Sequence, residues 1–240
     1  MARGGARDPA RRVSRLRGCF VTGTDTGVGK TVLAAAILAA LRDRRHAVRA
    51  LKPVVTGLGE EPDADWPHDH ELLARAAGSQ PADVALYTYG PAVSPHLAAE
   101  LSGEPIDRAR LRQAVTARAP DVVLVVEGVG GLLVPLDADY LVRDLARDTG
   151  LPLVLAARPG LGTINHTLLT LEAARRADLQ VSGVVLTPWP ERPDEMLRSN
   201  RDTIERLGAV KVATLPHIAR PEQSLLAAAG NALPLERWLG

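Results

Sequence analysis

Cysteine and long apolar runs are nearly absent from this chain of 240 residues. A single cysteine, Cys19, excludes an internal disulfide framework and fits a reducing cytoplasm. It falls in a predicted strand, where we expect a buried core thiol rather than a nucleophile. The longest apolar run, residues 32–41, is too short to span a bilayer, and no apolar segment of the secretory type is present. We therefore expect a cytoplasmic protein with no membrane partner.

A strong net charge is also absent, because the formal value is only +1. Six arginines and one aspartate give residues 1–17 a charge of +5, so the remaining residues carry −4. That balance argues against a basic nucleic-acid-binding surface. Residues 1–17 show no apolar periodicity and are predicted to be a disordered basic extension, with a transit peptide or a misplaced start codon as alternatives. Residues 18–240 are predicted to form one domain.

Apolar strand-like runs alternate with helical patterns along the rest of the chain. The predicted strands are residues 19–22, 48–51, 122–127, 153–157, 181–186 and 210–214. The predicted helices are residues 31–44, 69–77, 95–101, 108–118, 140–148, 163–177, 195–207 and 221–229. Such alternation, with continuous apolar runs as strands, predicts an α/β fold: a doubly wound, mostly parallel sheet with helices on both faces.

A glycine-rich turn, GTDTGVGKT at residues 23–31, connects the first strand to a long Ala/Leu-rich helix. Its glycines let the backbone close around phosphate oxygens, and the helix N-terminus favours an anion. Lys30 would reach the β- and γ-phosphates, and the Thr31 hydroxyl would bind Mg²⁺. The leading glycine, Gly23, stands one position too early for the strict P-loop pattern. The alternative, a turn that binds nothing, is disfavoured by the strand and helix on either side.

Polar residues follow the other predicted strands, and parallel strand ends meet at one edge of a sheet. Lys52 follows the second strand, where a second lysine could stabilise charge on a transferring phosphoryl group or simply be a surface lysine. Glu127 ends the third strand and suits Mg²⁺, although a buried structural carboxylate is the alternative. Asp69 is either a second magnesium ligand or a helix N-cap. Zinc at His68 and His70 is disfavoured, because no further well-spaced ligand follows.

Two further segments bear on a site at this edge. Residues 57–67 are rich in glycine, proline and acidic residues, and we predict a mobile loop over the site. The turn at residues 160–165 opens another helix, so it is either a second anion site or a simple helix cap.

Taken together, these segments closely resemble dethiobiotin synthetase, a P-loop NTPase-like family. The resemblance rests on residues 23–31, KPVVTG at 52–57, SPH at 94–96, EGVGG at 127–131 and INH at 164–166, and it covers residues 18 to about 220. It implies a ligase of biotin biosynthesis that uses a nucleoside triphosphate with Mg²⁺. One amine of 7,8-diaminopelargonate captures CO₂ as a carbamate, which attacks the γ-phosphate. The second amine then closes the cyclic urea and expels phosphate.

The resemblance also implies residue roles and a homodimer. The implied catalytic residues are Lys52, Lys30 and Thr26. The implied metal ligands are Thr31, Asp69 and Glu127. The implied nucleotide contacts are Gly27, Val28, Gly29, Lys30, Thr31, Val32, Asp69, Glu127, Gly128, Val129, Gly130, Thr187, Pro188, Pro216, His217 and Ile218. The implied contacts with the diamine substrate are Thr56, Gly162, Thr163, Ile164 and Asn165, the last four acting from the partner subunit on the substrate carboxylate.

The chain departs from the family at two positions and from its rivals at others. Some members carry Glu where this chain has Gly27, and many carry a base-reading Asn at or next to Thr187, so the preferred triphosphate stays open. The related partition and septum-positioning ATPases carry a lysine where this chain has Asp25. Cobyrinate-type amide synthetases normally carry a glutaminase domain, for which 240 residues leave no room. A degenerate nucleotide-binding module is disfavoured because Lys30, Thr31, Lys52 and Glu127 are all present.

Overall fold

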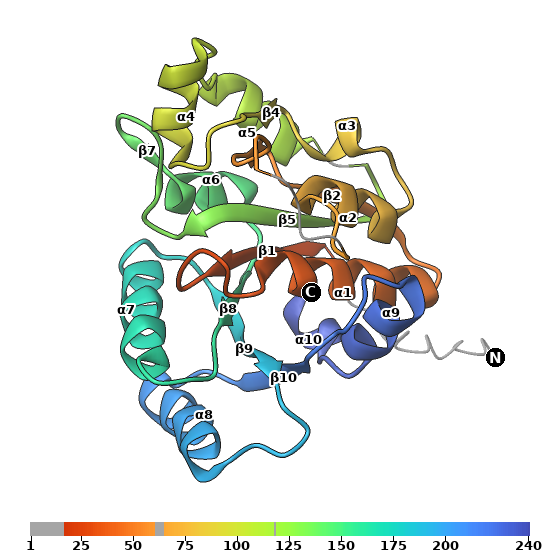
Figure 1. Ribbon diagram of the computed structural model, residues 1–240, viewed down its shortest axis with the longest axis vertical. Coiled ribbons are helices and arrows are strands. Elements are labelled where there is room, and N and C mark those ends of the chain that lie inside the picture. Colours follow the sequence, from red (N-terminus) through yellow and green to blue (C-terminus); the bar gives the residue numbers. More distant parts are fainter. Residues whose placement is uncertain (1–16, 61–64, 118) are drawn as a thin grey trace, which may run out of the picture.

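A six-stranded sheet is the centre of the computed structural model, which describes residues 17–60, 65–117 and 119–240 (Figure 1). Its strands lie in the order β10 (Val212–Pro216), β9 (Val181–Trp189), β8 (Leu153–Ala157), β1 (Gly18–Gly23), β5 (Val122–Gly131) and β2 (Ala47–Leu51). All five neighbouring pairs are parallel. The prediction of a doubly wound parallel sheet is confirmed, and every strand points its carboxyl end toward the same edge.

The central strands are buried on both faces, as their continuous apolar runs predict. Every residue of β1 and of β8 is buried. Side chains alternate between the two faces of β1: Cys19 and Val21 join one core cluster, and Phe20 joins the other. Burial raises the pKa of the Cys19 thiol to about 12, which is the chemistry of an inert core residue.

Helix α1 (Lys30–Asp43) covers one face of the sheet between α2 (Asp69–Ala77) and α9 (Gln223–Asn231), as Figure 1 shows. Residues 33–41 of α1 have no exposed surface. The alanines of this helix let α9 approach very closely, because a Cβ added to Gly230 would lie 2.0 Å from the Ala36 carbonyl oxygen. The short helix α10 (Leu235–Trp238) completes this layer.

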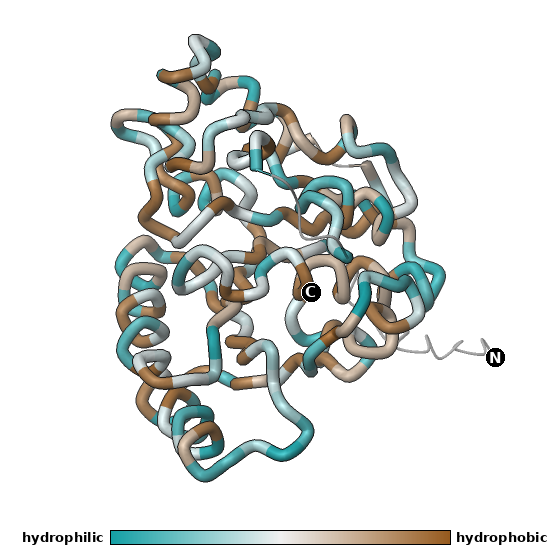
Figure 2. The backbone as a smooth tube through the Cα atoms, in the orientation of Figure 1, coloured by the Kyte–Doolittle hydropathy of each residue, from teal (hydrophilic) through white to brown (hydrophobic). Residues whose placement is uncertain are grey.

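The opposite face carries α5 (Arg108–Thr116), α6 (Val142–Thr149), α7 (Thr163–Arg176) and α8 (Glu195–Gly208). Figure 2 shows hydrophobic and hydrophilic residues alternating along α7 and α8, as expected for helices with one buried side. Helix α4 (Pro95–Ser102) lies further out, beside the two-stranded pair β3 (Val54–Val55) and β4 (Tyr87–Thr88). Within the described residues, no helix is both long and apolar enough to cross a membrane.

Several predicted boundaries are wrong. The helix predicted from residue 140 begins at Val142, because Tyr140 and Leu141 form β7 and pair with β6 (Pro135–Asp137). Strands β5 and β9 continue to Gly131 and Trp189, and β10 starts two residues later than predicted. The short helix α3 (Pro81–Val84), α10 and the small β-pairs had no sequence signal. Most of the predicted basic extension, residues 1–16, lies outside the described residues, while the Arg17 amide donates to the Leu239 carbonyl at 2.6 Å.

Candidate active site

A cavity of about 920 Å³ opens at the carboxyl edge of the sheet. Its walls come from the glycine-rich loop and first turn of α1, the chain after β2, the start of α2, the segment before α4, and the chain around the end of β5. The lining residues are Thr26, Gly27, Gly29, Lys30, Thr31, Val32, Lys52, Thr56, Gly57, Glu60, Trp66, Asp69, Ala92, Val93, Ser94, Pro95, Val129, Gly130 and Val134.

The glycine-rich loop has the backbone that a phosphate cradle needs. Gly27 and Gly29 have φ values of 68° and 89°, in the left-handed region that glycine tolerates best. A Cβ on Gly29 would also lie 2.7 Å from the Thr187 methyl carbon. Gly29 precedes α1 without a side-chain cap, so the first N–H groups of the helix remain available to an anion. The Lys30 ammonium donates to the Asp25 carbonyl at 2.8 Å, within the same loop.

Four side chains from different parts of the chain meet beneath this loop. The Lys52 ammonium donates to Glu127 Oε1 at 2.7 Å and also pairs with Asp69. The Thr31 hydroxyl donates to the same Glu127 oxygen at 2.9 Å. Lys52 and Glu127 are only 4% and 1% exposed. Sequence reasoning placed these residues at one sheet edge, and the structure brings them together.

Burial and pairing shift the pKa values of this cluster. Burial alone would lower the pKa of Lys52, but Glu127 and Asp69 beside it raise that pKa overall, so Lys52 is charged. Burial opposes ionisation of Asp69 too, yet Lys52 holds the pKa of Asp69 below its usual value. For Glu127, burial raises the pKa and Lys52 offsets only part of the shift. Burial likewise lowers the pKa of Lys30.

The same cluster fits a magnesium ion. Thr31, Asp69 and Glu127 supply hydroxyl and carboxylate oxygens, the ligand type that Mg²⁺ prefers. Glu127 Oε2 is buried and has no hydrogen-bond partner, so one ligand oxygen is left over by the protein's own contacts. For zinc the described residues offer less: His68 and His70 stack at 6.2 Å, and the described part of the chain contains no group of three or more His, Cys, Asp or Glu that could hold a metal.

Other residues predicted for the site divide into two groups. Thr26 and Thr56 line the cavity with Val32, Val129 and Gly130. Val28 is buried beneath the loop, and a Cβ on Gly128 would lie 2.9 Å from a methyl carbon of Val142, which places both glycine and valine in supporting positions.

The remaining predicted residues lie outside the lining of this cavity. Thr187 is 3% exposed and lies directly behind Gly29, and Pro188 follows it on the surface. At the end of β10, Pro216 and His217 are exposed and Ile218 is buried in the core. Thr163, at the start of α7, lines a separate cavity of about 100 Å³, while Gly162 and Asn165 are exposed and Ile164 packs on the core. Their binding roles stay predictions.

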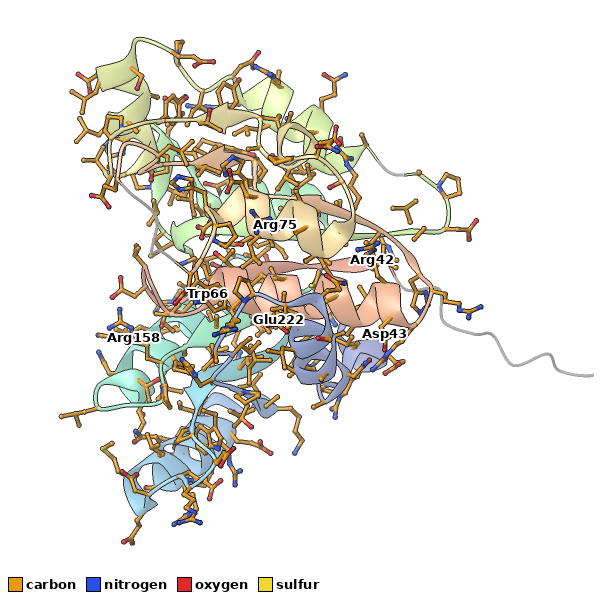
Figure 3. The ribbon with its side chains drawn as sticks, turned by 45° about the vertical axis from the view of Figure 1, so that its right-hand side comes forward. Arg42, Asp43, Trp66, Arg75, Arg158 and Glu222 are labelled. Carbon is orange, nitrogen blue, oxygen red and sulfur yellow. The ribbon has the colours of Figure 1, made fainter. Side chains whose placement is uncertain are left out.

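Sequence reasoning missed three side chains near the loop. Glu60 and Trp66 line the main cavity from the irregular segment 57–67, whose predicted position over the site is compatible with this placement; residues 61–64 lie outside the described part. Arg158, after β8, donates to the Thr26 carbonyl at 3.1 Å and braces the loop from outside. Figure 3 shows Arg158 and Trp66 near the end of α1 where that loop lies. No periodicity or motif marks Glu60 or Trp66.

A parallel sheet with a glycine-rich loop, its lysine and threonine, and a carboxylate on the neighbouring strand define a P-loop nucleotide-binding protein. A family model described as an AAA domain matches residues 17–223. The cell division ATPase MinD of Pyrococcus furiosus shares the fold, with a TM-score of 0.52 and 18% identity over 92% of this chain and 96% of that one.

Curated relatives identify the branch of this class. An ATP-dependent dethiobiotin synthetase of Haloferax mediterranei is 39% identical over 91% of this chain and 92% of its own length. One from Anaeromyxobacter dehalogenans is 42% identical over 88% and 96%, and one from Bacillus subtilis 35% identical over 82% and 85%. The chain belongs to the dethiobiotin synthetase family.

Proposed function

We propose that this chain is a MgATP-dependent ligase that makes dethiobiotin from 7,8-diaminopelargonate and CO₂ in biotin biosynthesis. The observation that carries the proposal is the meeting of Lys30, Lys52 and the oxygens of Thr31, Asp69 and Glu127 around one cavity. Family membership supports the same conclusion.

The proposed reaction forms two C–N bonds in sequence. One amine attacks CO₂ and loses a proton, giving a carbamate. A carbamate oxygen attacks the γ-phosphorus, and the nucleoside diphosphate leaves with the bonding electron pair. The second amine attacks the carbonyl carbon of this mixed anhydride, loses a proton and expels phosphate, which closes the cyclic urea.

The protein's contribution is mainly charge and position. Lys30, at the start of α1, pairs with the β- and γ-phosphates, and the free N–H groups of the loop hold the phosphate oxygens. Lys52 is kept protonated by its two carboxylate neighbours and, with Thr26, faces the carbamate and γ-phosphate. Magnesium held by Thr31, Asp69 and Glu127 would neutralise charge on the phosphates.

The diamine needs a pocket that accepts positive charge. Glu60 and Asp69 are the acidic side chains among the described residues that line the cavity, and Asp69 is paired with Lys52. Glu60 therefore offers its carboxylate to an ammonium group of the substrate, beside Thr56. This assignment adds to the contacts that the family resemblance implies.

A cytoplasmic homodimer completes the proposal. The start of α7 lies outside the main cavity of its own chain, which fits a role at the cavity of a partner subunit. Leu161 and Leu169, at and near this helix start, are 95% and 57% exposed, as expected for an apolar contact between subunits. Asn200 donates to the Pro159 carbonyl at 3.0 Å and holds the preceding turn in place.

The deciding experiment measures phosphate release from MgATP and bicarbonate with and without 7,8-diaminopelargonate, followed by the mass of the product. Diamine-dependent release with the mass of dethiobiotin supports the proposal. Release that ignores the diamine supports a nucleotide switch instead, and nucleotide binding without release supports an inactive binding module. For the dimer, mixing inactive Lys52→Ala and Asn165→Ala chains should restore turnover if each site uses both subunits.

A further inference from the structure

Trp66 is a half-buried tryptophan in the wall of the main cavity. Among the described residues that line this cavity it is the only aromatic one. Part of its ring packs against the core cluster that contains α1, together with Val32. The remainder faces the cavity. One side of the indole is thus supported by the protein, and the ring also presents surface to a ligand.

The position of Trp66 relative to the phosphate loop suggests which part of a ligand it meets. Lys30 reaches the β- and γ-phosphates, and the first turn of the helix that follows holds the α- and β-phosphates. The nucleoside therefore leaves the phosphates on the side of the first turn of α1. Val32 lies in that turn and lines the same cavity as Trp66. In Figure 3, Trp66 is drawn near this end of α1.

The chain offers the base little else inside this cavity. Thr187, the residue at or next to the expected base-reading position, is buried behind Gly29 and does not line the cavity. His217 is exposed and also lies outside the lining. A base that stays in the cavity consequently meets an aromatic face rather than a set of polar groups matched to its edge.

We propose that Trp66 is the stacking platform for the nucleobase and makes the site tolerant of different nucleoside triphosphates. Every base has a π-face, so stacking gives affinity with little base selectivity. This inference rests on the proposed function, which assigns the triphosphate to this cavity. It goes further by naming the residue that holds the base and the breadth of nucleotides that follows.

The test compares ligands with and without a base, using calorimetry on the full chain with Mg²⁺. Trp66→Leu keeps an apolar side chain but removes the π-face, and Trp66→Phe restores an aromatic ring. We expect Trp66→Leu to weaken binding of ATP, CTP and GTP by about tenfold or more, a loss of ~1.4 kcal/mol. Binding of inorganic tripolyphosphate should be unchanged, and Trp66→Phe should recover most of the nucleotide affinity.

Trp189 provides the matched control. It is the other half-buried tryptophan, but it packs on the cluster around β9 and α8 and lies outside the cavity lining. We expect Trp189→Leu to leave the affinities for ATP and tripolyphosphate unchanged. If Trp189→Leu weakens ATP alone while Trp66→Leu does not, the base binds near the ends of β9 and β10 and the proposal is wrong.

Two other outcomes overturn it as well. Equal losses for ATP and tripolyphosphate in Trp66→Leu would mean a structural role, and a strong preference of the unmodified protein for one base would contradict tolerance. Binding is measured without the diamine, so the result is separate from the test of the reaction. A base-dependent loss without diamine-dependent turnover would retain the stacking role and reject the ligase.

Discussion

Replacing Lys52 with methionine tests the buried ion-pair cluster, because the change removes the ammonium and keeps most of the side-chain volume. Glu127 and Asp69 would then share one pocket without the cation that pairs with both. Breaking a buried ion pair by removing one partner typically costs about 3–5 kcal/mol. For a chain of 240 residues, unfolding entropy is roughly 0.5 kcal/mol per kelvin. The midpoint of thermal unfolding should therefore fall by about 6–10 °C.

The loss of stability should depend on pH in a defined direction. Burial already raises the pKa of Glu127, and removal of Lys52 raises it further. A carboxyl whose folded pKa exceeds its unfolded value favours the folded state at low pH and loses that contribution as pH rises through the folded pKa. The deficit of Lys52→Met relative to the unmodified protein should therefore be smaller at pH 5 than at pH 8.

Calorimetry in EDTA, with phosphate release measured separately, checks both parts. Lys52→Met should bind MgATP yet show no turnover, since Lys30 and the loop remain. The double variant Lys52→Met/Glu127→Gln should regain much of the stability and none of the activity. An unchanged unfolding midpoint would refute the ion-pair argument, and retained turnover would refute the catalytic role of Lys52.

Three further predictions concern single side chains. Glu127→Gln should raise the Mg²⁺ concentration needed for half-maximal turnover, and an unchanged requirement would remove Glu127 from the metal site. Glu60→Gln should raise KM for the diamine by about tenfold with little change in KM for ATP, because a hydrogen bond to a charged group is worth ~1.5–3 kcal/mol; equal KM values would exclude that contact. Since burial raises the pKa of Cys19 to about 12, a thiol reagent at pH 8 should label the unfolded protein and spare the folded one, whereas rapid labelling of folded protein would contradict this burial.

Sequence reasoning was most successful where one physical rule decides the structure. Lys52 and Glu127 each follow a continuous apolar run, and the parallel pairing of β2 with β5 brings those strand ends together. The glycine-rich loop needs only local geometry, so GTDTGVGKT was sufficient to place Lys30 and Thr31.

Other features depend on contacts that periodicity does not encode. Tyr140 pairs in β7 and its phenol donates to Asp148 at 2.6 Å, so tertiary contacts override a helical pattern that begins near that residue. The place of Thr187 behind Gly29 depends on how β9 aligns with the phosphate loop across the sheet. Trp66 comes from a segment with no regular pattern, and its position at the cavity follows from packing against α1.

The order of strands in the sheet has a consequence for how the protein is made. Strand β1 pairs with β5 and β8, so Gly18 lies against Leu124 and Phe20 against Leu153, while β2, the next strand of the main sheet in sequence, pairs with β5 instead. Neither neighbour of β1 has been synthesised when the phosphate loop leaves the ribosome. Such long-range pairing gives a high contact order, which slows folding and leaves apolar strands exposed during synthesis. We therefore expect chains that stop before β8 to aggregate rather than to accumulate as a nucleotide-binding fragment.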